Sequence, residues 1–130
     1  MYIWRVAHPE HTYQGFPSGP YVSAGLTPEI VMNMRPMGDA HSWEPSHPSP
    51  ISDPELCWIK DDERCGFISL DALFDWFEGF INLLRENGFI MYVYEVPECH
   101  VRIGAFGQVI FHCEYADEIC NVELGEEEAA

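Results

Sequence analysis

The chain has 130 residues, of which 22 are acidic and six are lysine or arginine, so its formal net charge at pH 7 is −16. This charge disfavours direct binding of nucleic acid, whose backbone carries dense negative charge of its own. Hydrophobic residues make up 47% of the chain, which argues against disorder, and no apolar run approaches the ~20 residues needed to span a bilayer.

The first predicted element is a strand over residues 2–7, rich in aromatic and β-branched side chains. A short helix over residues 27–34 is expected next, because Thr27 can cap a helix and Pro28 suits its first turn. Most of the ten prolines lie in the first 54 residues. The rest of this region is therefore predicted to be an ordered loop, held in place by burial of Trp43 and Trp58.

The clearest pattern predicts an amphipathic helix over residues 69–87. Ser69 is a good N-cap, and Asn87-Gly88 supplies a left-handed C-cap. Between them apolar residues recur at helical spacing, namely Leu70, Leu73, Phe74, Phe77, Phe80, Ile81 and Leu84. Gly79 in the middle costs about 1 kcal/mol relative to alanine, which indicates close packing.

Strands dominate the rest of the chain. A short strand is predicted at 65–68, a central strand at 89–96, and a hairpin formed by 101–103 and 108–113. Residues 116–124 are expected to form a helical turn and an edge strand. The prediction is one α+β domain over residues 1–124, with a mainly antiparallel sheet and the 69–87 helix packed on it. Residues 125–130 are predicted to be a disordered acidic tail.

The negative charge is unevenly placed. Residues 1–50 hold four acidic residues against Arg5 and Arg35, a net charge of −2, which leaves −14 for residues 51–130. A strongly negative surface attracts proteins with basic clefts. We therefore predict a partner-binding face made of Asp61, Asp62, Glu63, Asp71, Asp75, Glu78, Glu114, Asp117 and Glu118.

The histidines and cysteines do not predict a metal site, because none matches a Cys-x2-Cys or His-x3-His pattern. If a metal did bind, its ligands would be His47, Cys57 and Cys65. The five cysteines are expected to be free thiols in a reducing compartment. With no basic start followed by an apolar core, the amino terminus predicts a cytoplasmic protein.

A second candidate site is the segment His47-Pro48-Ser49-Pro50, followed by Asp53. Prolines stiffen the loop and reduce the conformational freedom that ordering a site would cost. A histidine and a carboxylate could act as a general base and its orienting partner. The alternative is a rigid connector that covers the sheet.

Several stretches resemble small accessory proteins encoded by phages and prophages. They include Tyr2-Ile3-Trp4-Arg5-Val6, Gly19-Pro20-Tyr21, His47-Pro48-x-Pro50, Cys65-Gly66-Phe67-x-Ser69, Trp76-Phe77, Gly88-Phe89, Val93-Tyr94-Glu95-Val96 and Gln108-Val109-Ile110-Phe111. The resemblance spans most of the chain and implies no established activity. Such genes include inhibitors of host defence.

A more distant similarity is to ADP-ribosyltransferases, whose motifs lie on separate strands. It would place Arg5 at the residue that holds NAD, Ser69 in the aromatic-hydrophobic-Ser/Thr motif, and Gln108 near the catalytic glutamate. Glutamine lacks the carboxylate that stabilises an oxocarbenium-like transition state. The resemblance therefore implies a transferase-like enzyme or an NAD-binding derivative, with transferase chemistry in question.

Two main hypotheses follow. The favoured one is a non-enzymatic, phage-type inhibitor that needs no cofactor. Its acidic face would bind a basic, nucleic-acid-binding defence protein of the host, as anti-CRISPR and anti-restriction DNA mimics do. The alternative is the NAD-dependent reading through Arg5, Ser69 and Gln108. A third reading, a phage structural component, predicts a stable homo-oligomer.

Overall fold

The computed structural model describes residues 1–21, 24–45, 47–49 and 52–125. Seven strands form one sheet in the order β5-β6-β3-β1-β4-β7, with β2 paired to β1, and every register pair among them is antiparallel. This confirms the predicted α+β class. The strands are β1 (Tyr2–Tyr13), β2 (Phe16–Ser18), β3 (Glu63–Phe67), β4 (Ile90–Glu95), β5 (Val101–Ile103), β6 (Gln108–His112) and β7 (Asp117–Glu123).

The order of the strands matches most of the sequence pattern. β4 is apolar on both faces and lies between β1 and β7, as its composition predicted. β5 and β6 form the expected hairpin, and β7 is the expected edge strand, with all of its residues exposed. Two 3₁₀ turns, η1 (Glu98–His100) and η2 (Cys113–Tyr115), precede β5 and β7.

Apolar side chains cover both faces of the sheet. Because neighbouring residues of a strand point to opposite faces, Val6 packs against the helices while Ile3 and Ala7 pack on the other side. The helix-side core consists of Val6, Met34, Met37, Phe67, Leu73, Trp76, Phe77, Ile81, Leu84, Phe89 and Leu124. The opposite core consists of Ile3, Ala7, Tyr92, Tyr94, Val96, Val109 and Phe111.

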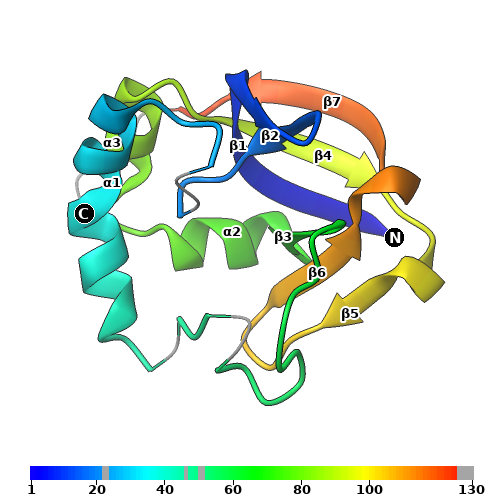
Figure 1. Cartoon of the computed structure of the whole chain (residues 1–130). Coiled ribbons are helices and arrows are strands. Elements are labelled where there is room, and N and C mark those ends of the chain that lie inside the picture. Colours follow the sequence, from blue (N-terminus) through cyan, green and yellow to red (C-terminus); the bar gives the residue numbers. More distant parts are fainter. Residues whose placement is uncertain (22–23, 46, 50–51, 126–130) are drawn as a thin grey trace.

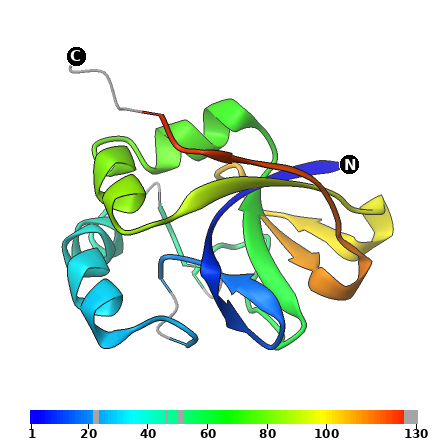
Figure 2. The ribbon, with the colours of Figure 1, turned by 90° about the horizontal axis from the view of Figure 1, so that it is seen from above.

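Three helices stand beside this sheet, α1 (Pro28–Ser42), α2 (Leu70–Trp76) and α3 (Ile81–Glu86). Figure 1 and Figure 2 both show α1 and α3 side by side, with α2 leading from the end of β3 toward them. The side-chain amide of Asn33 on α1 donates to Asn87 Oδ1, just beyond α3, at 2.9 Å. The helices therefore form one flank of the molecule.

The prediction of a single helix over 69–87 is wrong in its middle. α2 ends at Trp76 and α3 begins at Ile81, and Gly79 between them has φ of +87°. A residue in this left-handed region cannot continue a right-handed helix. Both predicted ends are confirmed, since Ser69 Oγ accepts from Ala72 N at 3.1 Å and Gly88 has φ of +87°.

The first half of the chain is more ordered than predicted. The expected helix at 27–34 has the right cap at Thr27 but continues to Ser42, through Pro36. Burial of Met34, Met37 and His41 on one face of α1 offsets the hydrogen bond that the proline removes. The first strand likewise continues past residue 7 to Tyr13 and turns back at Gln14-Gly15 into β2.

The expected burial of the two tryptophans is also wrong. Trp43 is 87% exposed and Trp58 is 55% exposed. Within its described residues, the 43–62 connection is instead held by the buried side chain of Leu56 and by Arg102, whose guanidinium donates to the carbonyls of Leu56 and Trp58 at 2.6 Å each. One apolar residue and a set of hydrogen bonds leave no periodic pattern in the sequence.

In the part of the chain that the structure describes, no helix has the length and apolar character required to cross a membrane. The predicted domain ends at Leu124, which is buried in the helix-side core. Of the predicted tail at 125–130, residues 126–130 lie outside the described part of the chain.

Candidate functional site

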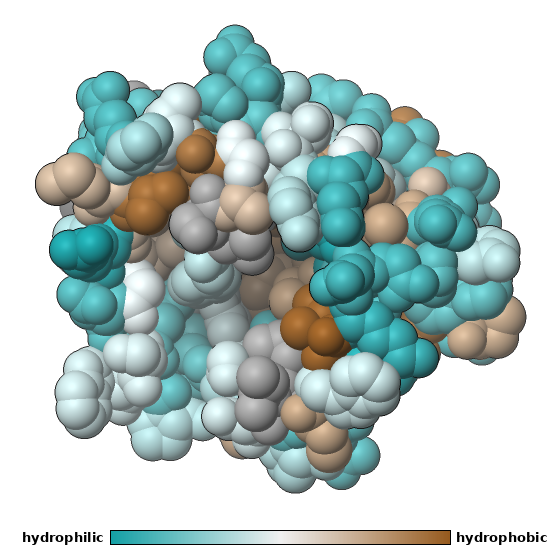
Figure 3. All heavy atoms as spheres, in the orientation of Figure 1, coloured by the Kyte–Doolittle hydropathy of each residue, from teal (hydrophilic) through white to brown (hydrophobic). Residues whose placement is uncertain are grey.

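A cavity of about 480 Å³ opens where the sheet divides between β1 and β3. These two strands share one register pair, Trp4 with Phe67, whereas β1 and β4 share six. Beyond that pair the strands diverge, and the space is closed by the Tyr21 loop, the end of α1 and the 47–49 segment. Figure 3 shows this face of the molecule hollowed at its centre, with hydrophobic atoms inside the hollow. A volume of this size lies within the roughly 300–1,000 Å³ of small-molecule sites.

Arg5 bridges the division in the sheet. Its two terminal nitrogens donate to the carbonyl oxygen of Cys65 on β3 at 2.6 Å and to that of Pro17 on β2 at 2.9 Å. The side chain is 5% exposed, and burial lowers the pKa of its guanidinium. Gly19 allows this position, because a Cβ there would come within 3.2 Å of the guanidinium. Arg5 thus serves as a cationic wall of the cavity.

Three of the six basic residues of the chain line this cavity, namely Arg5, Lys60 and Arg64. Within the described residues none of them forms an ion pair; Arg64 donates to the carbonyls of Asp61 and Glu63, and Lys60 lies over the Trp58 ring. The acidic side chains at the same cavity are Asp61 and Glu63. The cavity is therefore cationic inside a strongly anionic protein.

Glu63 is neutralised by another residue. Its carboxylate accepts two hydrogen bonds from Arg102, at 2.9 and 3.1 Å, and it is 9% exposed. Burial works against its charge, but the Arg102 hydrogen bonds and the Lys60 backbone N–H outweigh it, so the pKa of Glu63 is lowered. The sequence analysis expected Glu63 on an exposed acidic face, whereas the structure places it as a buried structural partner.

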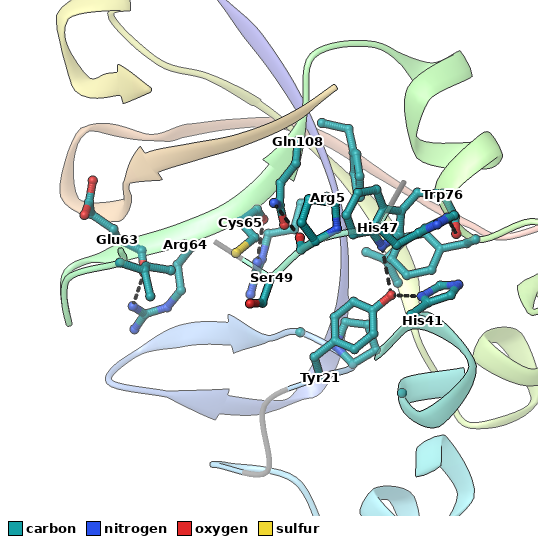
Figure 4. Close-up of a pocket in the computed structure, with 18 of the residues that line it drawn as sticks. Arg5, Tyr21, His41, His47, Ser49, Glu63, Arg64, Cys65, Trp76 and Gln108 are labelled. Carbon is teal, nitrogen blue, oxygen red and sulfur yellow. Dashed lines mark hydrogen bonds between the residues drawn. The ribbon is translucent and has the colours of Figure 1, made fainter. Parts of the chain in front are cut away.

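An aromatic wall lines the other end of the cavity. Trp76 Nε1 on α2 donates to the Tyr21 hydroxyl at 2.8 Å, and that hydroxyl is in turn hydrogen-bonded to Nδ1 of His41 on α1. The His41 and His47 rings stack with centroids 4.4 Å apart, and His47 Nε2 donates to the Trp76 carbonyl at 3.0 Å. Figure 4 shows these four side chains together.

One hydrogen-bonded chain joins the polar atoms of this wall. An indole N–H can only donate, so the Tyr21 oxygen accepts from Trp76 Nε1. The same oxygen is paired with His41 Nδ1, in a direction set by the histidine tautomer. Burial and the neighbouring His47 lower the pKa of His41 to about 4, and burial raises that of Tyr21. His41 and Tyr21 are therefore uncharged at neutral pH.

The proline-rich segment takes part in the site. His47, Pro48 and Ser49 line the cavity, and Gln108 on β6 donates to the Pro48 carbonyl at 3.2 Å. Pro50 lies outside the described residues. Asp53 is fully buried and accepts from the backbone N–H of Ala105 and Glu55, so it is not an orienting partner for His47. Residues 47–49 therefore form part of the cavity wall and also connect to the sheet through the hydrogen bond with Gln108.

The three residues of the NAD-dependent reading are only partly brought together. Arg5 and Gln108 line the same cavity, whereas Ser69 is not among its lining residues. The Ser69 hydroxyl caps α2 instead, accepting from Ala72 N at 3.1 Å. The cavity thus holds the two residues that could bind a ligand but not the proposed serine.

The predicted acidic face is divided into two groups. Asp61 and Asp62 precede β3, and Asp71, Asp75 and Glu78 follow it, so they lie at opposite ends of that strand. The first group meets η2 and the end of β6, because Cys113 N donates to the Asp62 carbonyl at 2.9 Å and His112 pairs with the Asp62 carboxylate at 2.8 Å. Asp61, Glu114, Asp117 and Glu118 are all exposed.

Among the described residues no group of three or more histidine, cysteine or acidic side chains could hold a metal ion. All five cysteines are free, as expected. Of the ligands considered for a metal, His47 and Cys65 line the cavity but Cys57 does not.

Sequence reasoning missed Tyr21, His41, Trp76, Lys60 and Arg64 as site residues. Tyr21 and Trp76 belong to stretches already singled out for resemblance, and both carry a polar group on a ring. That signal could have drawn attention to them. Nothing local marks Arg64 or His41, whose positions depend on packing between distant segments.

Comparison with known proteins gives one family. A family model described as Bacteriophage T4 Y00F protein matches residues 1–125. No curated protein shows a significant match, nor does any solved structure. Most of the stretches that carried the resemblance to phage proteins, including those around Arg5, Tyr21, His47, Trp76 and Gln108, contribute to the cavity.

Proposed function

Because this chain belongs to the bacteriophage T4 Y00F protein family, we propose that it is a phage accessory protein whose cavity binds a small anionic ligand. The observation that carries the proposal is Arg5, a buried guanidinium without a carboxylate partner in the described residues. Lys60 and Arg64 add positive charge at the same cavity.

The buried charge of Arg5 is costly without a partner. A cation removed from water loses several kcal/mol of solvation unless an anion or enough hydrogen bonds replace it. Two carbonyl oxygens satisfy part of the Arg5 guanidinium, but they carry no net charge. An anionic ligand would supply the missing counter-charge. Of the acidic residues in the described part of the chain, only Asp61 and Glu63 line this cavity, and Glu63 is paired with Arg102. The ligand would be taken up in the host cytoplasm.

The resemblance to ADP-ribosyltransferases makes NAD and ADP-ribose the first ligands to test. Arg5 and Gln108 support binding, since both line the cavity. No transfer step is proposed, because Ser69 caps a helix and Gln108 has an amide where a carboxylate would be needed. Saturable heat on titration with NAD would support this form of the proposal.

The general test is calorimetric titration with a panel of phosphates, carboxylates and nucleotides. We expect at least one to bind, and the K60M/R64M double variant to bind it at least tenfold more weakly. R35M is the matched control, because Arg35 does not line this cavity. Arg64 also donates to the Tyr13 carbonyl and to Gln14 Oε1 at 3.3 Å each, so urea unfolding first establishes that the double variant is folded. Absence of heat across the panel, or equal affinity of the double variant, would overturn the proposal.

A second candidate function uses the acidic end, defined as Asp61, Glu95, Glu98, Glu114, Asp117 and Glu118. All six are exposed, and Glu95 lies directly opposite Asp117 in the β4–β7 pair. Like charges placed opposite one another in a sheet are destabilising. Their presence favours a role for the charge itself, namely binding of a basic, nucleic-acid-binding host defence protein as a DNA mimic.

The test compares two triple variants of equal charge change. D61N/E114Q/D117N neutralises the acidic end, and D71N/D75N/E78Q neutralises the separate acids of α2 and the turn after it. With the protein as bait in a host lysate, a basic protein should elute at moderate salt. We expect D61N/E114Q/D117N to lose this captured protein and D71N/D75N/E78Q to retain it. Equal capture by the wild type and both variants would show that the acidic end is not the binding surface.

A further inference from the structure

The cavity has two chemically different ends. Figure 4 shows Arg5, Cys65 and Arg64 toward one side, and Tyr21, His41, His47 and Trp76 gathered toward the other. The cationic groups come from β1, β3 and the turn before β3, while the aromatic groups come from α1, α2 and the loops. Because different elements build the two ends, cationic side chains lie at one end of the cavity and aromatic side chains at the other.

The cationic end retains capacity for hydrogen bonding. A guanidinium has five N–H donors, and Arg5 uses two of them on the carbonyls of Cys65 and Pro17, which leaves three. Its Nε has no partner among the described residues. A phosphate or carboxylate is the group that a guanidinium binds most strongly, through charge-assisted hydrogen bonds. This end therefore fits an anionic group.

The polar atoms of the aromatic end are largely occupied by hydrogen bonds with one another. Trp76 Nε1, the Tyr21 hydroxyl and His41 Nδ1 bind one another, and His47 Nε2 is used on the Trp76 carbonyl. With these four polar atoms already paired, the wall presents mainly the faces of its rings to a ligand. His41 and Tyr21 in this wall are uncharged at neutral pH. Such a wall favours a planar, uncharged ring that can pack against other rings.

We infer that the ligand is a ring-bearing phosphate of the mononucleotide kind, with its phosphate against Arg5 and Arg64 and its planar ring against Tyr21 and Trp76. This inference rests on the proposed function and narrows it. A cavity with one charged end and one aromatic end distinguishes such a ligand from inorganic phosphate and from an uncharged nucleoside. Binding is expected to require both parts in one molecule.

The experiment is calorimetric titration of the full chain with AMP, UMP, GMP, CMP and phenyl phosphate, and with adenosine and inorganic phosphate as fragments. We expect at least one ring-bearing phosphate to bind at least tenfold more tightly than either fragment. Binding of phenyl phosphate alone assigns the ligand to aryl phosphates instead of nucleotides and supports the two-ended cavity.

Other outcomes overturn the inference in distinguishable ways. If inorganic phosphate binds as tightly as the best mononucleotide, the ring end is unused, and only the wider proposal of an anion site survives. If adenosine binds as tightly as AMP, the cationic end is unused and both proposals fail. If no anion binds, both fail as well. The K60M/R64M variant should weaken binding of the mononucleotide while leaving adenosine unchanged.

Discussion

Trp76 on α2 and Tyr21 in the loop after β2 are joined by a hydrogen bond of 2.8 Å, from the indole nitrogen to the phenol oxygen. The two residues are 55 positions apart in the chain. Through His41 the bond extends to α1, so one phenol links three separate parts of the cavity wall. This relationship sets the first two predictions.

Removing the Tyr21 hydroxyl should destabilise the protein. Y21F leaves Trp76 Nε1 and His41 Nδ1 without their partner, at a cost of about 1–3 kcal/mol. The matched control is Y94F, because the Tyr94 hydroxyl is buried and has no partner among the described residues. Y94F should be neutral or stabilising in urea unfolding. Equal destabilisation by both would contradict the role given to Tyr21.

We expect the free energy of unfolding to decrease at acidic pH, and part of this decrease to come from protonation of His41. Burial and His47 lower its pKa to about 4 in the folded protein, so between pH 6.5 and 4 the unfolded chain binds the proton more readily. Folding is therefore weakened as pH falls through this window, by on the order of 2 kcal/mol at pH 4.5, and is unaffected above it.

The check uses H41N, whose side-chain amide can still hydrogen-bond with the Tyr21 hydroxyl but does not titrate. Urea unfolding of both proteins at pH 7.5 and 4.5 gives the difference, from which the other titrating groups largely cancel. The wild type should lose more stability than H41N on acidification. Parallel losses would show that His41 is not held neutral.

Arg102 should be hard to replace with lysine. Its guanidinium binds both Glu63 oxygens and the carbonyls of Leu56 and Trp58, a set that one ammonium cannot reproduce. R102K is expected to cost about 2 kcal/mol. It should also expose the 56–58 segment to limited proteolysis. R35K is the control, since Arg35 is exposed, and it should change neither measurement.

Alanine at two helical-looking glycines should have opposite effects. Gly79 has φ of +87°, so G79A is expected to destabilise by about 1 kcal/mol, although a Cβ there would meet nothing within 4 Å. Gly38 lies inside α1, also with open space, so G38A should stabilise by up to about 1 kcal/mol. Stabilisation by G79A would indicate a continuous helix over residues 69–87.

The break at Gly79 shows which features of a helix local sequence patterns can predict and which they cannot. The caps at Ser69 and Asn87-Gly88 were predictable because each depends on bonds within a few residues. Apolar spacing from Leu70 to Leu84 also fits one helix, and a lone glycine costs a helix little. Whether it bends the chain depends on how Phe77 and Ile81 pack against distant residues, which spacing does not encode.

The cavity shows even more clearly the difference between what local sequence predicts and what tertiary packing decides. Composition and alternation determined the class of fold, the β5–β6 hairpin, the edge strand β7 and the net charge, because these follow from local bonding and from counting. Only the tertiary structure decided that Arg5, Arg64, Tyr21 and Trp76 meet around one space, and that Glu63 is a buried partner of Arg102. A cavity arises where β1 and β3 diverge, and that divergence results from long-range packing between segments distant in sequence.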